Sequence, residues 1–267
     1  MKRQKSVFII ALIAFAILLG LFGCGRSESA GVTVTQSTEH ESSETDSKID
    51  DKTHVSESQK TTRLPVCSET EKHIEETTKV RYKKESFDKT AFLGNSRFVA
   101  IKDYGLACNV FPVVGLDVNT AFSKHVDNSD VVVLDELDGK SFDKVILMFG
   151  ENECGWPNED YFIRKYAKVI ETVKEKAPET EIYLHAMLPV SAEISEKNEW
   201  NCNNERISDL NGRIRLLAED ECVHYIEQPQ CLKDHNGNLI DGASNDGVHL
   251  NRKYCEIWMQ YLDEYLK

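Results

Sequence analysis

Apolar runs of strand length alternate with stretches of helical periodicity over the last two thirds of the 267-residue chain. The clearest run is Asp-Lys-Val-Ile-Leu-Met-Phe at 143–149, which is typical of a buried strand. Residues 158–176 follow it and place their apolar side chains on one broad face of a helix. Similar patterns give a strand ending at Gly94, strands at 107–114, 181–188 and 222–226, a minor strand or loop edge at 131–134, and helices at 98–101, 117–125, 203–220 and 252–265. This alternation predicts an α/β domain of three layers, in which helices cover both faces of a central parallel sheet.

Polar and glycine residues mark the ends of three expected strands. In such sheets ligands bind beyond the carboxyl ends of the strands. The three strand ends are Gly94-Asn95-Ser96, Gly115 and Gly150-Glu151-Asn152. Ser96 is expected at a strand-to-helix junction, where unpaired N–H groups of the first helical turn can donate to an oxyanion. Taken alone, Gly-Asn-Ser is also the pattern of an N-cap or turn serine.

A fourth polar segment, Ser244–Asn251, precedes the closing helix. Asp246 and His249 are three residues apart across a glycine, so both can lie on the same side of one turn. The carboxylate can then accept from one imidazole nitrogen and leave the other facing the site, as a serine nucleophile requires. By itself, Asp-x-x-His is also an ordinary helix-capping loop.

In this order, the four segments resemble the SGNH (GDSL-type) hydrolase family. The resemblance extends over essentially the whole expected domain and implies a flavodoxin-like α/β/α fold. It implies that Ser96 is the nucleophile, His249 the general base and Asp246 the residue that orients the imidazole. The implied oxyanion hole consists of the backbone N–H groups of Ser96 and Gly115 and the side-chain amide of Asn152. No cofactor or metal is implied.

Residues beside these positions raise separate expectations. The family usually has Gly-Asp-Ser where this chain has Asn95, and that aspartate is not a triad member. Arg97 either contacts an anionic substrate or is an exposed surface arginine. Glu151 and Glu153 are expected to accept from backbone amides of their loop. Trp156 either lines an acyl or sugar pocket or packs in the core.

The start of the chain has the layout of an export signal. Three basic residues among the first five precede an apolar stretch at 7–22, followed by Gly23-Cys24. The stretch is shorter than the ~20 residues of a comfortable membrane span, although an uncleaved anchor is the alternative. Leu-x-Gly-Cys resembles a bacterial lipoprotein signal. It implies removal of residues 1–23, lipidation of Cys24, and attachment to the extracytoplasmic face of the cell membrane.

Residues 24–88 are rich in Ser, Thr, Glu, Asp and Lys. Such a segment buries too little apolar surface to offset its ordering entropy, so we expect a disordered stalk and a single globular domain at 89–267. The formal charge is −13, and removing the three basic residues of the signal makes it −16. That balance is unfavourable for nucleic acid, which is bound mainly through its phosphates.

Eight cysteines are present. With Cys24 lipidated, seven remain in an oxidising compartment, so at least one is free or pairs between chains. Cys222 and Cys231 are one candidate bridge. The chain has no C-x-x-C spacing, so we expect no zinc site.

These features predict a membrane-tethered, extracytoplasmic serine esterase that hydrolyses small acyl esters through an acyl-enzyme. The stalk and the wall-side location favour O-acetyl groups on carbohydrate as the substrate. The same triad serves a lipid or thioester acylhydrolase and an acyltransferase. An alternative from a different class is a non-catalytic glycan-binding lipoprotein on the same fold.

Overall fold

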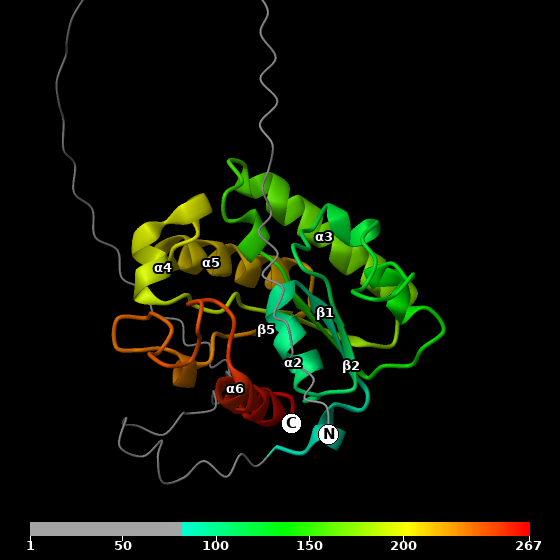
Figure 1. Ribbon diagram of the computed structural model, residues 1–267. Helices are drawn as coiled ribbons and strands as arrows, with labels where there is room; N and C mark the ends of the chain where they lie inside the picture. The colour runs from blue at the N-terminus through cyan, green and yellow to red at the C-terminus, as the bar shows by residue number, and fades with distance from the viewer. Residues whose placement is uncertain (1–81) are drawn as a thin grey trace, which may run out of the picture. The chain divides into compact units, whose positions relative to one another are not determined.

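A five-stranded parallel sheet organises residues 82–267, the part of the chain that the computed structural model describes (Figure 1). The strands are β1 (Thr90–Gly94), β2 (Asn109–Pro112), β3 (Lys144–Met148), β4 (Glu181–His185) and β5 (His224–Ile226). Their order is β2-β1-β3-β4-β5, and every neighbouring pair is parallel. The connections therefore change direction between β1 and β3, which is where ligands bind in doubly wound sheets. The predicted α/β fold is confirmed.

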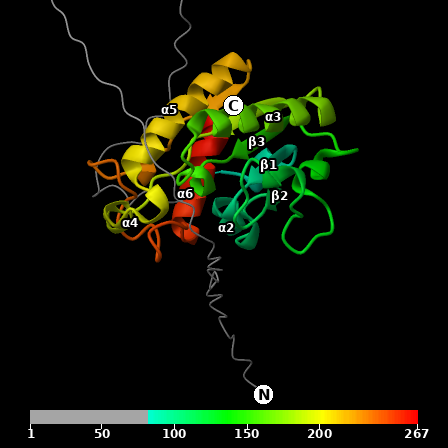
Figure 2. The same ribbon diagram turned by 90° about the horizontal axis from the view of Figure 1, so that it is seen from above.

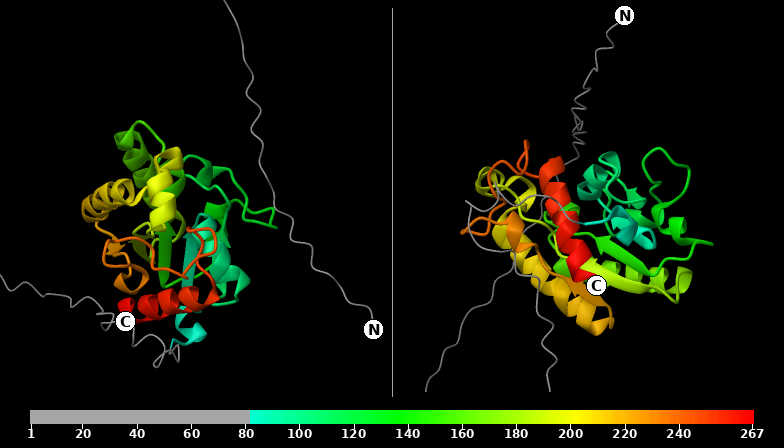
Figure 3. Two further views of the ribbon diagram at one scale, coloured as in Figure 1. Left: turned by 60° about the vertical axis from the view of Figure 1, so that its left-hand side comes forward. Right: turned by 90° about the horizontal axis from the view of Figure 1, so that it is seen from below.

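Different helices cover the two faces of the sheet (Figures 2 and 3). On one face, Leu93 and Leu147 share an apolar cluster with α3 (Glu159–Lys176) and α5 (Asn204–Asp220). The other face packs against α2 (Val99–Asp103) and α6 (Arg252–Tyr265), and there Phe92 and Ile146 contribute instead. Successive strand residues point to opposite faces, so both faces are apolar and both are buried.

The long helices agree with their apolar periodicity. The closing helix has the predicted bounds, and Asn251 caps it by accepting from the Tyr254 N–H. The helices expected from residues 158 and 203 begin one residue later, because the side chains of Asn158 and Asn203 are their N-caps.

Two local predictions were wrong, and a third was confirmed only in part. Residues 117–125 form only a three-residue 3-10 helix, Thr120–Phe122. The Asp117 carboxylate accepts from the backbone N–H groups of Asn119 and Thr120 and so makes a local turn instead of a longer helix. Residues 131–134 form a loop edge and no full strand: Val132 makes an isolated antiparallel bridge with His125, and a buried 3-10 helix, Val133–Leu137, follows directly. Cys222 is a free thiol, so the Cys222–Cys231 disulfide is also wrong.

The signal, Cys24 and most of the expected stalk lie outside the described residues. Within residues 82–267, no helix has the length and apolar character needed to cross a membrane. Lys84–Phe87 form a 3-10 helix, and the Phe87 side chain is buried in the core. Ordered structure therefore already includes the last residues of the segment expected to be stalk.

His185 ends β4 and is completely buried. Trp258 Nε1 donates to its Nε2 at 2.9 Å, and its Nδ1 lies 2.6 Å from the Ala186 carbonyl oxygen. These partners suit a neutral imidazole with its proton on Nδ1. Burial lowers the pKa of His185 to about 4, although the hydrogen bond to Ala186 acts in the opposite direction.

This burial makes stability depend on pH. In the unfolded chain His185 is protonated below an ordinary imidazole pKa of ~6.5, whereas in the folded chain it stays neutral down to about pH 4. We expect His185 to contribute a loss of about 3 kcal/mol in the free energy of unfolding as the pH falls through this window. Urea unfolding of the wild type and His185→Gln at several pH values measures it. An equally steep dependence in the variant would contradict this assignment.

Candidate active site

Ser96 lies where β1 passes into the first helical turn. It begins a 3-10 helix, Ser96–Phe98, that runs directly into α2, and Asn95 is the N-cap. Among the described residues, the Ser96 N–H has no hydrogen-bond partner, as expected for the first residue of a helix. Gly94 permits this junction, because a Cβ there would lie 2.7 Å from the Met148 carbonyl oxygen of β3. The N–H and hydroxyl of Ser96 are both available at the sheet edge.

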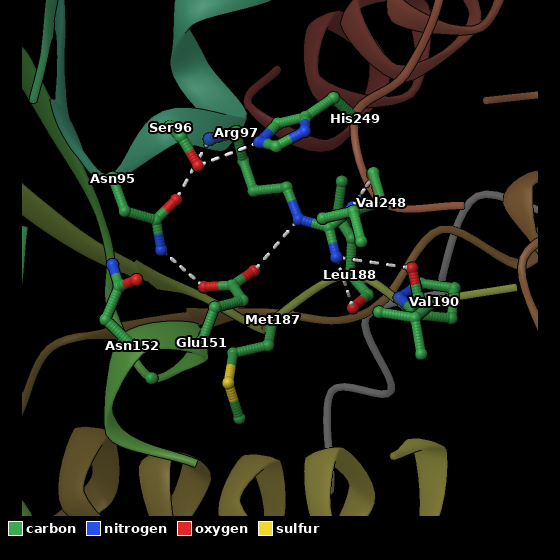
Figure 4. Close-up of polar contacts among 12 residues, drawn as sticks. Asn95, Ser96, Arg97, Glu151, Asn152, Met187, Leu188, Val190, Val248 and His249 are labelled. Carbon is green, nitrogen blue, oxygen red and sulfur yellow. Dashed lines mark hydrogen bonds and ion pairs between the residues drawn. The ribbon is translucent and has the colours of Figure 1, made fainter. Parts of the chain in front are cut away.

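A chain of hydrogen bonds joins Ser96 to the loop before α6. His249 Nε2 lies 2.9 Å from Ser96 Oγ (Figure 4). The other ring nitrogen, Nδ1, lies 2.7 Å from Asp246 Oδ2. The structure therefore brings together the three residues expected to form the triad, although 153 positions separate the serine from the histidine.

The Asp246 carboxylate is stabilised in its ionised form. Partial burial raises its pKa, but hydrogen bonds from the His249 ring, from the backbone N–H groups of His249 and Val248, and from Ser244 outweigh burial. Together they hold the pKa of Asp246 well below its usual range. This carboxylate can orient the imidazole and stabilise the positive charge that a general base acquires.

Asn152 links the loops that follow β2 and β3. It lies in the 3-10 helix Glu151–Glu153, and its Nδ2 donates to the Leu116 carbonyl oxygen at 2.7 Å. That bond uses one of the two amide protons and leaves the other available. Gly115 adopts φ +66°, its carbonyl accepts from Lys124 Nζ at 2.7 Å, and its N–H has no partner in the described residues. The structure therefore leaves the expected donors on Gly115 and Asn152 available.

Glu153 joins the same two loops from inside the protein. Its carboxylate accepts from the N–H groups of Val118 at 2.8 Å and Gly150 at 3.0 Å, as the sequence predicts. Burial raises its pKa to about 8, although these two hydrogen bonds act against the shift. Glu153 is a buried brace of the Asn152 loop and points away from the solvent.

Arg97 corrects both sequence interpretations, since it is neither exposed nor available to a substrate. Only 3% of its surface is exposed. The guanidinium donates to the carbonyl oxygen of Val248 and lies 3.5 and 3.4 Å from those of Leu188 and Pro189 (Figure 4). Local sequence carries no sign of this burial, because all three carbonyl groups come from distant segments.

Glu151 also differs from its prediction. It accepts from the side chain of Asn95 at 2.5 Å and forms an ion pair with Arg97 at 3.4 Å, instead of accepting from loop amides. Trp156 is a packing residue: it is half-buried against the core, with its ring 5.8 Å from that of Tyr161.

A cavity of about 290 Å³ opens beside Ser96 and His249. Its walls combine one face of the α2 segment with the loop that carries the histidine. The lining residues besides Ser96 and His249 are Val99, Ala100, Asp103, Tyr104, Asn245, Asp246, Leu250 and Asn251. In the described part of the chain, no group of three His, Cys, Asp or Glu side chains is placed to hold a metal ion.

Comparison with known proteins gives one family match. The model of the GDSL-like lipase/acylhydrolase family matches residues 108–254, which include Asn152, Asp246 and His249. The match begins after Ser96 and therefore does not include the serine. No curated protein matches the chain.

Solved structures that share the fold include two bacterial proteins. A Streptococcus pneumoniae protein described as a platelet activating factor is 23% identical, with a TM-score of 0.54 over 73% of this chain and 94% of its own. A GDSL-like lipase from Bacteroides thetaiotaomicron is 18% identical, with a TM-score of 0.52 over 69% of this chain and 90% of its own.

Proposed function

The chain belongs to the GDSL-like lipase/acylhydrolase family, and from that premise we propose that it is a serine esterase acting through an acyl-enzyme on Ser96. The hydrogen-bond chain from Asp246 through His249 to Ser96 carries the proposal. This arrangement supplies a nucleophile, a base beside it and a group that fixes the base.

In the proposed reaction, His249 Nε2 removes the Ser96 proton while Oγ attacks the ester carbonyl carbon. The carbonyl oxygen becomes an oxyanion and accepts from the N–H groups of Ser96 and Gly115 and the amide of Asn152. When the tetrahedral intermediate collapses, the C–O bond to the alcohol breaks and the imidazolium gives its proton to the departing oxygen. Water then attacks the acyl-enzyme by the same route, which releases the acid and restores Ser96.

We propose small acyl esters, and O-acetyl groups on carbohydrate in particular, as substrates. The cavity of about 290 Å³ is at the lower limit of ordinary small-molecule sites, so it suits a short acyl group. Asp103, Tyr104, Asn245 and Asn251 line it and can hydrogen-bond to sugar hydroxyls. Export and attachment to the outer face of the membrane through Cys24, as the first 24 residues suggest, would place the enzyme beside surface glycans.

Acyl-chain preference tests the substrate class. We expect kcat/KM for p-nitrophenyl acetate to exceed that for p-nitrophenyl decanoate by at least about tenfold, because the cavity limits chain length. Acetate release from O-acetylated oligosaccharides should require Ser96, with Ser96→Ala as the control. A preference for the decanoate would favour a lipid acylhydrolase. Oligosaccharide binding that is unchanged in Ser96→Ala, without turnover in the wild type, would favour the glycan-binding alternative.

A further inference from the structure

Three side chains behind the nucleophile, Asn95, Arg97 and Glu151, form a connected buried group that we call the buried clamp (Figure 4). We propose that the buried clamp holds the loops of Ser96, Asn152 and His249 in register for the reaction. Arg97 and Glu151 are then positioning residues, since neither touches the cavity. The inference rests on the proposed function and assigns a role to residues outside the triad and oxyanion hole.

Arg97 provides the link between the serine and the histidine. It follows the nucleophile directly in the chain, and its guanidinium donates to the carbonyl oxygen of Val248, the residue before His249. The same group faces the carbonyl oxygens of Leu188 and Pro189, beyond the end of β4. A planar guanidinium with five donors can bind three carbonyl groups at fixed angles, so it ties the histidine loop to the sheet edge.

Glu151 provides the link to the oxyanion loop. It directly precedes Asn152, and its Oε1 lies 3.4 Å from Arg97 Nε. The Arg97 and Glu151 side chains are 1% and 11% exposed, and neither of these two atoms has a hydrogen bond to any other group among the described residues. A buried charge needs an opposite charge beside it. Movement of either loop would therefore separate the two charges, which opposes that movement.

Asn95 is the third member of the buried clamp, and its contacts explain why this chain has asparagine where the usual pattern is Gly-Asp-Ser. Its Nδ2 donates to Glu151 Oε2 at 2.5 Å, and its Oδ1 accepts from the Arg97 backbone N–H at 3.0 Å. An aspartate at position 95 would instead place two carboxylates in contact, which repel each other. The amide of Asn95 is thus matched to the carboxylate of Glu151.

Exchanging the amide and the carboxylate tests the clamp in the full chain. With p-nitrophenyl acetate, we expect Asn95→Asp and Glu151→Gln each to lower kcat by about tenfold to 100-fold, because misplaced catalytic groups stabilise the transition state less well. KM should change by less than about threefold. The double variant restores the hydrogen bond with donor and acceptor exchanged, and it keeps one negative charge near Arg97. We expect its kcat to return to within about threefold of the wild type.

Arg213→Gln is the matched control. It breaks the contacts of Arg213 with Glu159 and Asp160, which join α5 to α3, and should change kcat by less than about twofold. A double variant with the summed defects of the single variants, or one that does not fold, would overturn the clamp. Wild-type kcat in both single variants would overturn it as well.

A second readout separates the clamp from the proposed function. The imidazole NMR signals of His249 report the position of its loop whether or not the protein turns over an ester. The clamp predicts that both single variants shift these signals and that the double variant restores them. An inactive wild type would remove the proposed function, whereas unshifted His249 signals in the single variants would remove the clamp.

Discussion

Replacing Ser96 with alanine is expected to lower kcat for p-nitrophenyl acetate by on the order of 10⁵- to 10⁶-fold, because the acyl-enzyme can no longer form. His249→Ala should lower kcat by a similar factor, since it removes the base that lies 2.9 Å from the Ser96 hydroxyl. The two residues act as one unit, so the double variant should be about as active as either single variant.

Steady-state kinetics of the wild type and the three variants measure this effect, with circular dichroism confirming that each variant folds. Substantial activity in Ser96→Ala would show that another group attacks the ester. Losses that multiply in the double variant would show that Ser96 and His249 act independently, contrary to the hydrogen bond between them.

Asp246→Asn is expected to lower kcat by about 10³- to 10⁴-fold at neutral pH. The asparagine amide can donate to His249 Nδ1, which favours the imidazole tautomer with its proton on Nε2. In that tautomer Nε2 cannot accept the proton from Ser96 Oγ. In the wild type, hydrogen bonds keep the pKa of Asp246 well below its usual range. Its carboxylate therefore remains ionised over the acid limb of the pH–activity profile, the range in which kcat falls as the pH is lowered. The loss in Asp246→Asn should therefore persist throughout that limb.

Asp241→Asn is a suitable control, because it removes the same charge from an exposed residue in the adjoining loop. It should retain wild-type kcat to within about twofold. Equal losses in the two variants would indicate a general charge effect instead of orientation of the imidazole. Full activity in Asp246→Asn would contradict the role assigned to the carboxylate.

Local patterns predicted the features that depend on local chemistry. Asp246 and His249 are close because one glycine-containing turn brings them together, and the spacing alone indicates this. The closing helix α6 begins at Arg252, directly after its N-cap Asn251, as its sequence predicts. The place of Ser96 could be predicted because a serine after a buried strand lies at the carboxyl edge of a parallel sheet, whereas its role as nucleophile was implied by the resemblance to the SGNH (GDSL-type) family.

Features that depend on distant partners could not be predicted in this way. Arg97 looks like a surface residue in its own segment, yet the carbonyl groups that accept from it lie 91 to 151 positions away. Glu151 bonds to Asn95, 56 positions away, in preference to its own loop. The unusual asparagine at position 95 was the one signal in the sequence that pointed to this arrangement.

The proposed mechanism depends on an acyl-enzyme at Ser96, which mass spectrometry of the trapped intermediate can detect. The protein is mixed with p-nitrophenyl acetate, quenched in acid, digested and mapped. We expect one acetyl group on the peptide that contains Ser96, and none on the corresponding peptide of Ser96→Ala. Hydrolysis that proceeds without this adduct, or an adduct that forms equally in Ser96→Ala, would contradict it.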